Sequence, residues 1–140
     1  MNELLEKALR IAVKAHAGQV DRAGKPYIFH PLRVCYRCFT DEEKIVALLH
    51  DTIEDTEVTA EDLLREGFPR NIVDAVLSVS RNEDEGYEDF VKRTSLNPLG
   101  RAVKLHDLED NMDISRLDQV TEKDLGRLNK YIKAYRHLKG

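Results

Sequence analysis

A chain of 140 residues with 41% hydrophobic and 34% charged residues is typical of one soluble globular domain, and we expect a single unit over residues 1–140. No apolar run approaches the roughly 18 residues that a membrane span needs, and the first residues lack the features of a secretory signal, so a cytoplasmic protein is expected. The formal net charge of −4 argues against nucleic acid as the main partner, whereas a small anionic ligand is compatible with locally clustered basic residues.

Apolar positions recur at helical spacing through the first part of the chain. One face of the first 15 or so residues is apolar, which predicts a helix that Gly18 ends. Residues 28–39 indicate a second helix. Thr40 and Glu43 have the spacing of a capping box, so a third helix is predicted to begin there and to run through the segment IVALLHDTIED at residues 45–55.

Caps, glycines and prolines divide the rest of the chain. Further helices are expected over residues 59–66 up to Gly67, from Pro69 through residue 77, over residues 87–95, from Asn97 and Pro98 through residue 112, and over residues 122–138. No alternating segment is long enough for a strand, and no internal repeat or low-complexity linker divides the chain. The sequence therefore predicts an all-α, single-domain bundle of about seven or eight helices.

The only two cysteines, Cys35 and Cys38, form a C-x-x-C pair. Val34 and Phe39 beside them favour a position within a helix rather than at the exposed helix start that redox pairs use. Two reduced structural thiols are therefore predicted. No second pair of cysteines is present to complete a structural zinc site.

Residues 50–56, HDTIEDT, place four groups that can bind a metal or move a proton directly behind an apolar run. At 100° per residue, His50 and Glu54 lie one turn apart, and Asp51 and Asp55 lie beside them. Negative charge at a helix C-terminus opposes the helix dipole, and a bound cation would remove this conflict. A solvated acidic turn is the alternative interpretation of the same residues.

Two other motifs supply partners for this segment. His30 lies in PYIFHPLRV, at a loop-to-helix junction from which its imidazole can reach a cavity. Lys104, Asp107 and Asn111 are spaced i, i+3 and i+7, which places them on one face of the predicted long helix. Two nitrogens and two oxygens suit a six-coordinate divalent ion such as manganese, with positions left for water and substrate. The expected ligands are His30, His50, Asp51 and Asp107.

Two further histidines lie in these motifs. His16 is on the apolar face of the first helix and is expected to be a hydrogen-bonded core residue rather than a ligand. His106 precedes Asp107 but points about 100° away from it on a helix, so contact with a substrate is not expected.

The ordered segments AHAGQ, GKPYIFHPLRV, ALLHDTIEDT and VKLHDLEDNM resemble the HD-domain phosphohydrolases of the RelA/SpoT type, including small stand-alone alarmone hydrolases of the metazoan SpoT kind. The resemblance spans roughly residues 8–117. It implies an HD-domain fold and a manganese-dependent 3′-pyrophosphohydrolase that acts on guanosine 3′,5′-bis(diphosphate), ppGpp, or on the pentaphosphate. It also implies metal-ligand roles for the four residues named above, with other divalent ions as possible substitutes for manganese.

The resemblance further implies that Glu54 and Asp55 orient or deprotonate the attacking water, and that Asn111 helps to hold the nucleotide. These roles agree with the chemistry, because a divalent ion makes water more acidic and carboxylates one turn past the ligands are placed to take its proton. Basic residues near the motifs are expected to bind phosphate oxygens, although each is also a candidate for a solvated surface cation. They are Arg22, Lys25 and Lys104.

Three positions depart from the alarmone-hydrolase pattern. Asp21 precedes Arg22 where that pattern has two basic residues, Leu108 stands in place of an arginine, and Asp110 precedes Asn111. These changes predict a less basic nucleotide side. Two alternatives stay open: the same chemistry on another phosphorylated nucleotide, such as a nicotinamide or adenine derivative, and a non-catalytic nucleotide-binding module. The second is disfavoured because such a module has no need of a pair of proton acceptors.

Overall fold

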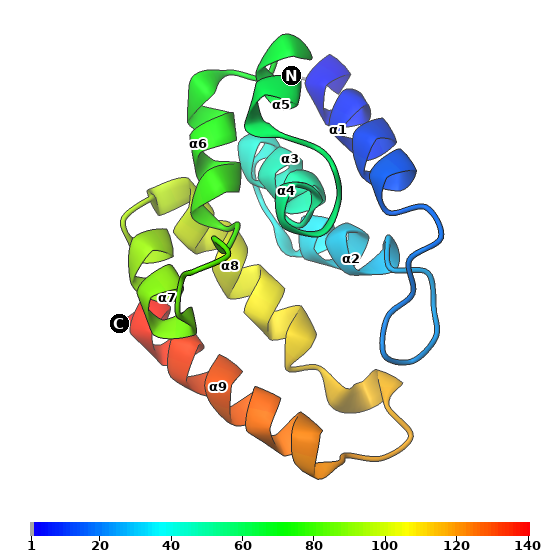
Figure 1. The fold of residues 1–140 in the computed structure, drawn as a ribbon, viewed down its shortest axis with the longest axis vertical. Coiled ribbons are helices and arrows are strands. Elements are labelled where there is room, and N and C mark those ends of the chain that lie inside the picture. The colour runs from blue at the N-terminus through cyan, green and yellow to red at the C-terminus, as the bar shows by residue number, and fades with distance from the viewer. Residues whose placement is uncertain (1) are drawn as a thin grey trace.

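The structure is a computed structural model that describes residues 2–140, and most of these residues are helical (Figure 1). The elements are α1 (Asn2–Ala15), α2 (Phe29–Arg37), α3 (Asp41–Leu49), α4 (Thr52–Asp55), α5 (Ala60–Arg65), α6 (Arg70–Ser78), α7 (Tyr87–Ser95), α8 (Pro98–Asn111), a 3-10 turn (Ile114–Arg116) and α9 (Glu122–Lys139). The predicted all-α class is confirmed. Over residues 2–140, none of the helices is both long and apolar enough to cross a membrane.

Side-chain caps set the helix starts that the sequence predicts. Thr40 and Glu43 form the expected capping box at the start of α3. The side chain of Asn97 accepts a hydrogen bond from the backbone N–H of Gly100, and Pro98 is the first residue of α8. Two more capping boxes open α5 and α9. Because these signals act within one turn of helix, they can be read without knowledge of the tertiary fold.

The helix predicted through residues 45–55 is two helices. α3 ends at Leu49 and α4 begins at Thr52, and Asp51 between them has φ −101° and ψ −1°. The Thr52 hydroxyl donates to the Leu49 carbonyl at 2.8 Å, a local bond that competes with regular helix hydrogen bonding. Glu54 and Asp55 therefore lie in the single turn of α4 rather than at the end of one long helix. The long helix whose dipole was used to argue for a cation is absent from residues 45–55.

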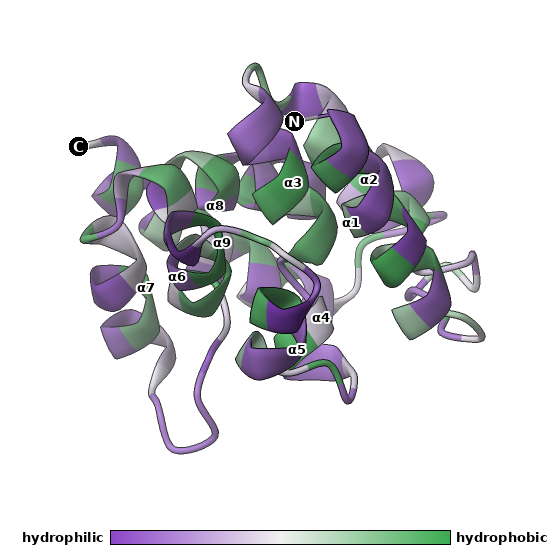
Figure 2. Ribbon diagram, turned by 90° about the horizontal axis from the view of Figure 1, so that it is seen from above, coloured by the Kyte–Doolittle hydropathy of each residue, from purple (hydrophilic) through white to green (hydrophobic). Residues whose placement is uncertain are grey.

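Two clusters of buried apolar side chains hold the bundle together. The larger one joins α1, α2, α3, α5, α6 and the first half of α8. The smaller one, formed by Val91, Leu108, Ala134 and Leu138, joins α7, α8 and α9. α8 crosses the molecule between the two and contributes to both (Figure 1). The loop between α6 and α7 is hydrophilic and projects from the bundle (Figure 2).

A close approach to α6 fixes the position of α8. At Gly100, a Cβ atom would lie 1.9 Å from the Ser78 hydroxyl oxygen and 3.4 Å from the Ala75 carbonyl oxygen. Only a glycine permits this contact without a shift of the two helices. The contact matters for the site because α8 carries the polar residues that face α2 and α3.

Candidate metal centre and nucleotide pocket

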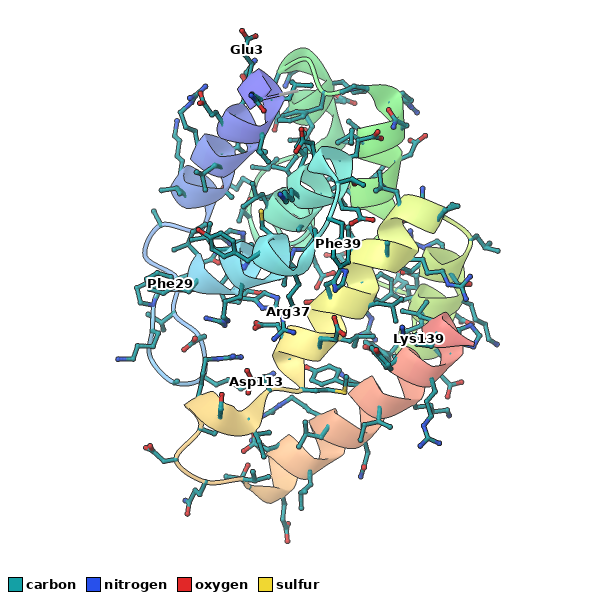
Figure 3. All side chains as sticks on the ribbon, turned by 180° about the vertical axis from the view of Figure 1, so that it is seen from behind. Glu3, Phe29, Arg37, Phe39, Asp113 and Lys139 are labelled. Atoms are coloured by element: carbon teal, nitrogen blue, oxygen red, sulfur yellow. The ribbon has the colours of Figure 1, made fainter. Side chains whose placement is uncertain are left out.

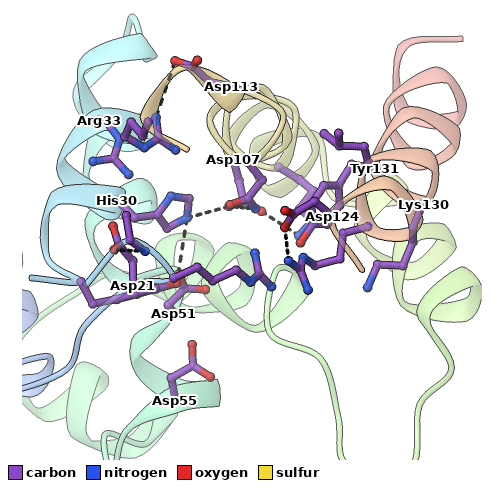
Figure 4. Close-up of a pocket in the computed structure, with 18 of the residues that line it drawn as sticks. Asp21, His30, Arg33, Asp51, Asp55, Asp107, Asp113, Asp124, Lys130 and Tyr131 are labelled. Atoms are coloured by element: carbon purple, nitrogen blue, oxygen red, sulfur yellow. Dashed lines mark hydrogen bonds and ion pairs between the residues drawn. The ribbon is translucent and has the colours of Figure 1, made fainter. Parts of the chain in front are cut away.

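The four residues predicted as metal ligands converge on one point, although they come from three segments of the chain. His30 Nε2 lies 2.9 Å from Asp107 Oδ1 and 3.7 Å from Asp51 Oδ2. His50 Nε2 lies 3.1 Å from Asp51 Oδ2 and 3.3 Å from Asp107 Oδ1. Figure 4 shows His30 reaching towards both carboxylates. Donor atoms of His30, His50 and Asp107 all lie within 4.8 Å of one another, and Asp51 adjoins the two histidines; their roles as ligands stay predictions.

The surroundings of His50 fit a divalent cation. Its ring is 2% exposed, and Nδ1 donates to the Ala47 carbonyl at 2.5 Å, which leaves the Nε2 lone pair facing the carboxylates of Asp51 and Asp107. Nε2 is buried, and within residues 2–140 no contact to it, including that with Asp51, has the geometry of a hydrogen bond. Burial alone would lower the pKa of His50, but the two carboxylates outweigh it and raise that pKa well above its ordinary value. A proton or a metal ion is therefore required between these groups.

Asp110 holds His30 from behind, a role that the sequence analysis missed. Its carboxylate is fully buried, with Oδ2 2.7 Å from His30 Nδ1 and Oδ1 accepting from Arg33 Nε at 2.9 Å. Arg116 Nη1 lies 3.5 Å from the same carboxylate. Arg33 and Arg116 both line the pocket, so the expectation that Asp110 makes the nucleotide side less basic stays a prediction. The position of Asp110 one helical turn after Asp107 is the signal in the sequence.

We expect Asp110→Asn to lower the affinity for a divalent ion by about 10- to 100-fold, because a histidine ligand loses its orienting carboxylate. The measurement is calorimetric titration of the chelator-treated protein with Mn²⁺. Asp113→Asn is the matched control, since this more exposed carboxylate also lies 3.5 Å from Arg116. Equal affinities in the two variants would show that Asp110 does not position His30.

Tyr27 orients a second ligand. Its hydroxyl donates to Asp51 Oδ2 at 2.5 Å, and burial together with the Asp51 charge raises the pKa of Tyr27, so it remains a donor. The His16 ring packs on Tyr27 with centroids 5.1 Å apart, and His16 Nδ1 lies 2.8 Å from Gln19 Oε1. His16 is thus the hydrogen-bonded core residue that was predicted. Spacing along the chain did not reveal Tyr27, although it lies three residues before His30.

Glu54 and Asp55 both line the pocket, but their carboxylates differ in hydrogen bonding. Glu54 Oε1 accepts a hydrogen bond from the Arg81 backbone N–H at 2.7 Å. Within residues 2–140, no hydrogen bond uses the Asp55 carboxylate, which lines the pocket below Asp51 (Figure 4). Burial, followed by the charges of Asp51 and Glu54, raises the pKa of Asp55 to about 6. Asp55 therefore has the properties of a proton acceptor near neutral pH.

The predicted substrate-binding residues occupy three kinds of position. Lys104 Nζ donates to Asp107 Oδ2 at 2.7 Å, and Asn111 Nδ2 donates to Asp107 Oδ1 at 3.2 Å, so both support a proposed ligand while lining the pocket. Arg22 lines the pocket near its opening, whereas Lys25 is exposed outside its wall. Their contacts with phosphate remain predictions.

The pocket has a volume of about 450 Å³, within the range of small-molecule sites, and both acidic and basic side chains line it. α9 and the loop after α6 contribute Arg81, Arg127, Lys130 and Tyr131, together with Asp124, which forms a salt bridge with Arg127. Burial and neighbouring cations lower the pKa of Lys130; the cations are Arg81, Lys104, Arg22 and Arg127.

Leu108 and the cations of α9 bear on the predicted nucleotide side. Leu108 is fully buried in the smaller core and does not line the pocket, and the expectation of a less basic nucleotide side stays a prediction. The cations of α9 were missed because they lie outside every motif. Their spacing of three residues, Arg127 and Lys130, is the only local sign of a shared helix face.

No protein-family model matches the chain. It is 33% identical over 122 residues to the guanosine-3′,5′-bis(diphosphate) 3′-pyrophosphohydrolase of Aquifex aeolicus, an alignment that covers 79% of this chain and 17% of the relative. It is also 33% identical over 141 positions to the GTP pyrophosphokinase of Myxococcus xanthus, covering 90% and 19%. The bifunctional (p)ppGpp synthase/hydrolase SpoT of Escherichia coli is 36% identical over 91 residues, covering 61% and 12%. The chain thus spans less than a fifth of each of these relatives.

A solved structure described as a metazoan orthologue of SpoT, which hydrolyses ppGpp and plays a role in starvation responses, has the same fold. It superimposes with a TM-score of 0.79 and 21% sequence identity, and the match covers 98% of this chain and 86% of that one. The sequence matches and the shared fold lead to the same assignment. The chain is an HD domain of the RelA/SpoT type.

Proposed function

We propose that this chain is a metal-dependent hydrolase that removes the 3′-pyrophosphate from ppGpp. The observation that carries the proposal is that the four predicted ligands and the cations of α9 line one pocket. One phosphate group of a nucleotide can then reach the predicted ligands while another meets Lys130 and Arg127, which also pairs with Asp124. The names of the relatives support guanosine 3′,5′-bis(diphosphate) as the substrate.

Manganese is the ion that we propose for the cluster formed by His30, His50, Asp51 and Asp107. Two imidazole nitrogens and two carboxylate oxygens suit a six-coordinate ion of intermediate hardness better than a tetrahedral thiolate metal. Held there, the ion would supply a more acidic water and a screen for phosphate charge. Lys104 and Asn111 hold Asp107 in place through its two carboxylate oxygens.

The other residues of the pocket have separate roles in the proposed hydrolysis. Asp55 accepts the proton of the attacking water, and Glu54, held by the Arg81 amide, orients that water. Water adds across the bond between the 3′ oxygen and phosphorus, which releases GDP and pyrophosphate. The cations of α9 and of the loop after α6 hold the phosphates that do not react, by charge-assisted hydrogen bonds.

The test is to incubate the manganese-loaded protein with a panel of phosphorylated nucleotides and to identify the released product. Pyrophosphate released from ppGpp faster than any product from the other nucleotides is the expected result. Release of single phosphate from a nicotinamide or adenine nucleotide, without turnover of ppGpp, would replace the substrate but keep the chemistry. A protein that binds these nucleotides and releases nothing from any of them is a non-catalytic module.

Asp21→Asn should lower KM for ppGpp by roughly 3- to 10-fold with kcat unchanged. Asp21 lines the pocket, and a negative charge about 6 Å from a phosphate costs on the order of 2 to 3 kcal/mol before salt screening reduces it. Asparagine preserves the turn, because Asp21 Oδ1 accepts from the backbone N–H groups of Ala23 and Lys25. Steady-state kinetics should separate this uniform binding effect from chemistry. The control Asp118→Asn should leave KM unchanged. An unchanged KM in Asp21→Asn as well would show that the charge of residue 21 does not affect substrate binding.

A further inference from the structure

A second group of metal-binding side chains lies outside the pocket. Donor atoms of Cys38, Glu43 and His106 all lie within 4.8 Å of one another, and none of the three residues lines the pocket. Cys38 follows the last residue of α2, Glu43 is in the first turn of α3, and His106 is in α8. Phe39, next to Cys38 and labelled in the view from behind (Figure 3), is 85% exposed, and its ring centroid lies 6.2 Å from that of His106.

The imidazole of this group is already oriented as in many metal sites. His106 Nδ1 lies 2.7 Å from Glu109 Oε1, so Nδ1 carries the proton given to the carboxylate and Nε2 is left with a free lone pair. Histidine ligands of metals commonly donate their other ring N–H to such a carboxylate. Both side chains come from α8, three residues apart, so the pair is independent of any ligand.

The other two donors are also held in place. Glu43 Oε1 accepts from the Thr40 backbone N–H at 3.5 Å in the capping box of α3 and from the Phe39 backbone N–H at 3.0 Å, which leaves the second carboxylate oxygen for another partner. The Cys38 thiol is 6% exposed and donates to the Val34 carbonyl at 3.3 Å. The group therefore offers one sulfur, one nitrogen and one oxygen from three helical elements.

We propose that Cys38, Glu43 and His106 bind a zinc ion at a second metal site. Thiolate, imidazole and carboxylate are all zinc ligands, and a water completes a tetrahedral set. Zn–S of about 2.3 Å and Zn–N of about 2.0 Å place neighbouring ligand atoms roughly 3.5 Å apart, so the side chains need to close by only about 1 Å. On binding, the thiol proton is released to solvent and the sulfur coordinates as thiolate.

A redox role for Cys35 and Cys38 is a weaker explanation. Burial raises the pKa of both thiols, and for Cys38 burial and the Glu43 carboxylate raise it to about 12, whereas redox cysteines have lowered values. Two carboxylates, Glu43 and Glu109, and a single ammonium group, Lys44, act on Cys38, so the local charge attracts a cation. The sequence analysis considered only a second pair of cysteines for a structural zinc site; here the partners of Cys38 are Glu43, five residues away, and His106, which is distant in sequence.

The proposed ion would connect the elements that form the pocket cluster. His30 is in α2, His50 directly follows α3, and Asp107 is in α8, and these three helices pack on one another. Zinc at the second site would join the end of α2 and the start of α3 to the middle of α8. His106 and Asp107 are adjacent but lie about 100° apart around α8, so the two sites face different directions.

The test uses Co²⁺ as a probe in the His50→Ala background, which disables the pocket cluster. A thiolate-to-cobalt charge-transfer band in the near ultraviolet is expected at one equivalent of metal. Cys38→Ser should abolish the band, while the matched control Cys35→Ser should retain it. No band at saturating Co²⁺ in the parent, or a band that survives Cys38→Ser or disappears in Cys35→Ser, would overturn the assignment.

A second measurement does not depend on changing the buried thiol. Glu109→Gln keeps all three ligands but weakens the orientation of His106, so zinc affinity measured by competition with a chromophoric chelator should fall by about 10- to 100-fold. Zinc should also raise the melting temperature of the His50→Ala protein and not that of His50→Ala with His106→Gln. Unchanged affinity in Glu109→Gln, together with equal melting temperatures, would exclude His106 as a ligand.

Discussion

His50→Ala and Asp107→Ala should each abolish stoichiometric binding of Mn²⁺ and reduce turnover of ppGpp by a factor on the order of 10³ or more. Each substitution removes one of four donors from a buried cluster in which His50 Nε2 has no other partner. A catalytic metal contributes several kcal/mol to transition-state stabilisation, and each 1.4 kcal/mol corresponds to a factor of ten in rate. Metal content after gel filtration and kcat are the two measurements.

A control and a folding check accompany these variants. His137→Ala removes an exposed histidine near the C-terminus and should retain full metal content and rate. Thermal unfolding of metal-free samples identifies any variant that has lost its structure, which matters because His50 and Asp107 are both buried. Full manganese occupancy in folded His50→Ala and folded Asp107→Ala would rule out the cluster as the metal site.

Asp55→Asn should reduce kcat by about 10² to 10⁴, and Glu54→Gln by no more than about tenfold. The two carboxylates differ in their surroundings: glutamine at position 54 can still accept the Arg81 N–H, whereas asparagine at position 55 cannot take a proton. The pKa of Asp55 is raised to about 6 in the metal-free protein, and a bound cation would lower it again by stabilising the carboxylate. The rate should therefore rise with pH and level off at or below about pH 6.

The pH dependence provides the sharper comparison of the two residues. Asp55 is active only when unprotonated, so kcat/KM of the parent falls as the pH is lowered through the pKa of Asp55. Glu54→Gln should retain this acidic limb, and Asp55→Asn should lose it together with most of the rate. If Glu54→Gln lacks the acidic limb and Asp55→Asn retains it, then Glu54 is the proton acceptor and Asp55 orients the water.

Local signals account for the parts of the fold that the sequence predicts well. The capping box of Thr40 and Glu43 and the cap at Asn97 act within one turn, so their helix starts agree with the structure. The break after Leu49 was not predicted, because the apolar period continues up to His50 and gives no sign of it. At the break, the Thr52 hydroxyl donates to the Leu49 backbone carbonyl. Such a side-chain hydrogen bond competes with the regular backbone hydrogen bonds of a helix.

In the candidate site, too, local sequence signals identified some residues and missed others. Histidine and aspartate in recognisable segments identified His30, His50, Asp51 and Asp107, and the structure places them together. The groups behind them were missed, because a supporting role depends on contact across the fold: Asp110 reaches His30 over 80 positions of sequence and Tyr27 reaches Asp51 over 24. Spacing along one helix places Asp110 one turn after Asp107 but cannot reveal that its partner is His30.

The separation of the two hydrophobic cores has a consequence for how such a protein changes its substrate. The cluster of acidic and histidine side chains depends on the larger core, whereas the α9 cations depend on the smaller one, and α8 is the shared element. If the proposed function holds, substitutions along α9 are expected to alter which nucleotide is retained while the predicted ligands stay in place. New specificity could then arise on one half of the molecule without a change in the hydrolytic groups of the other.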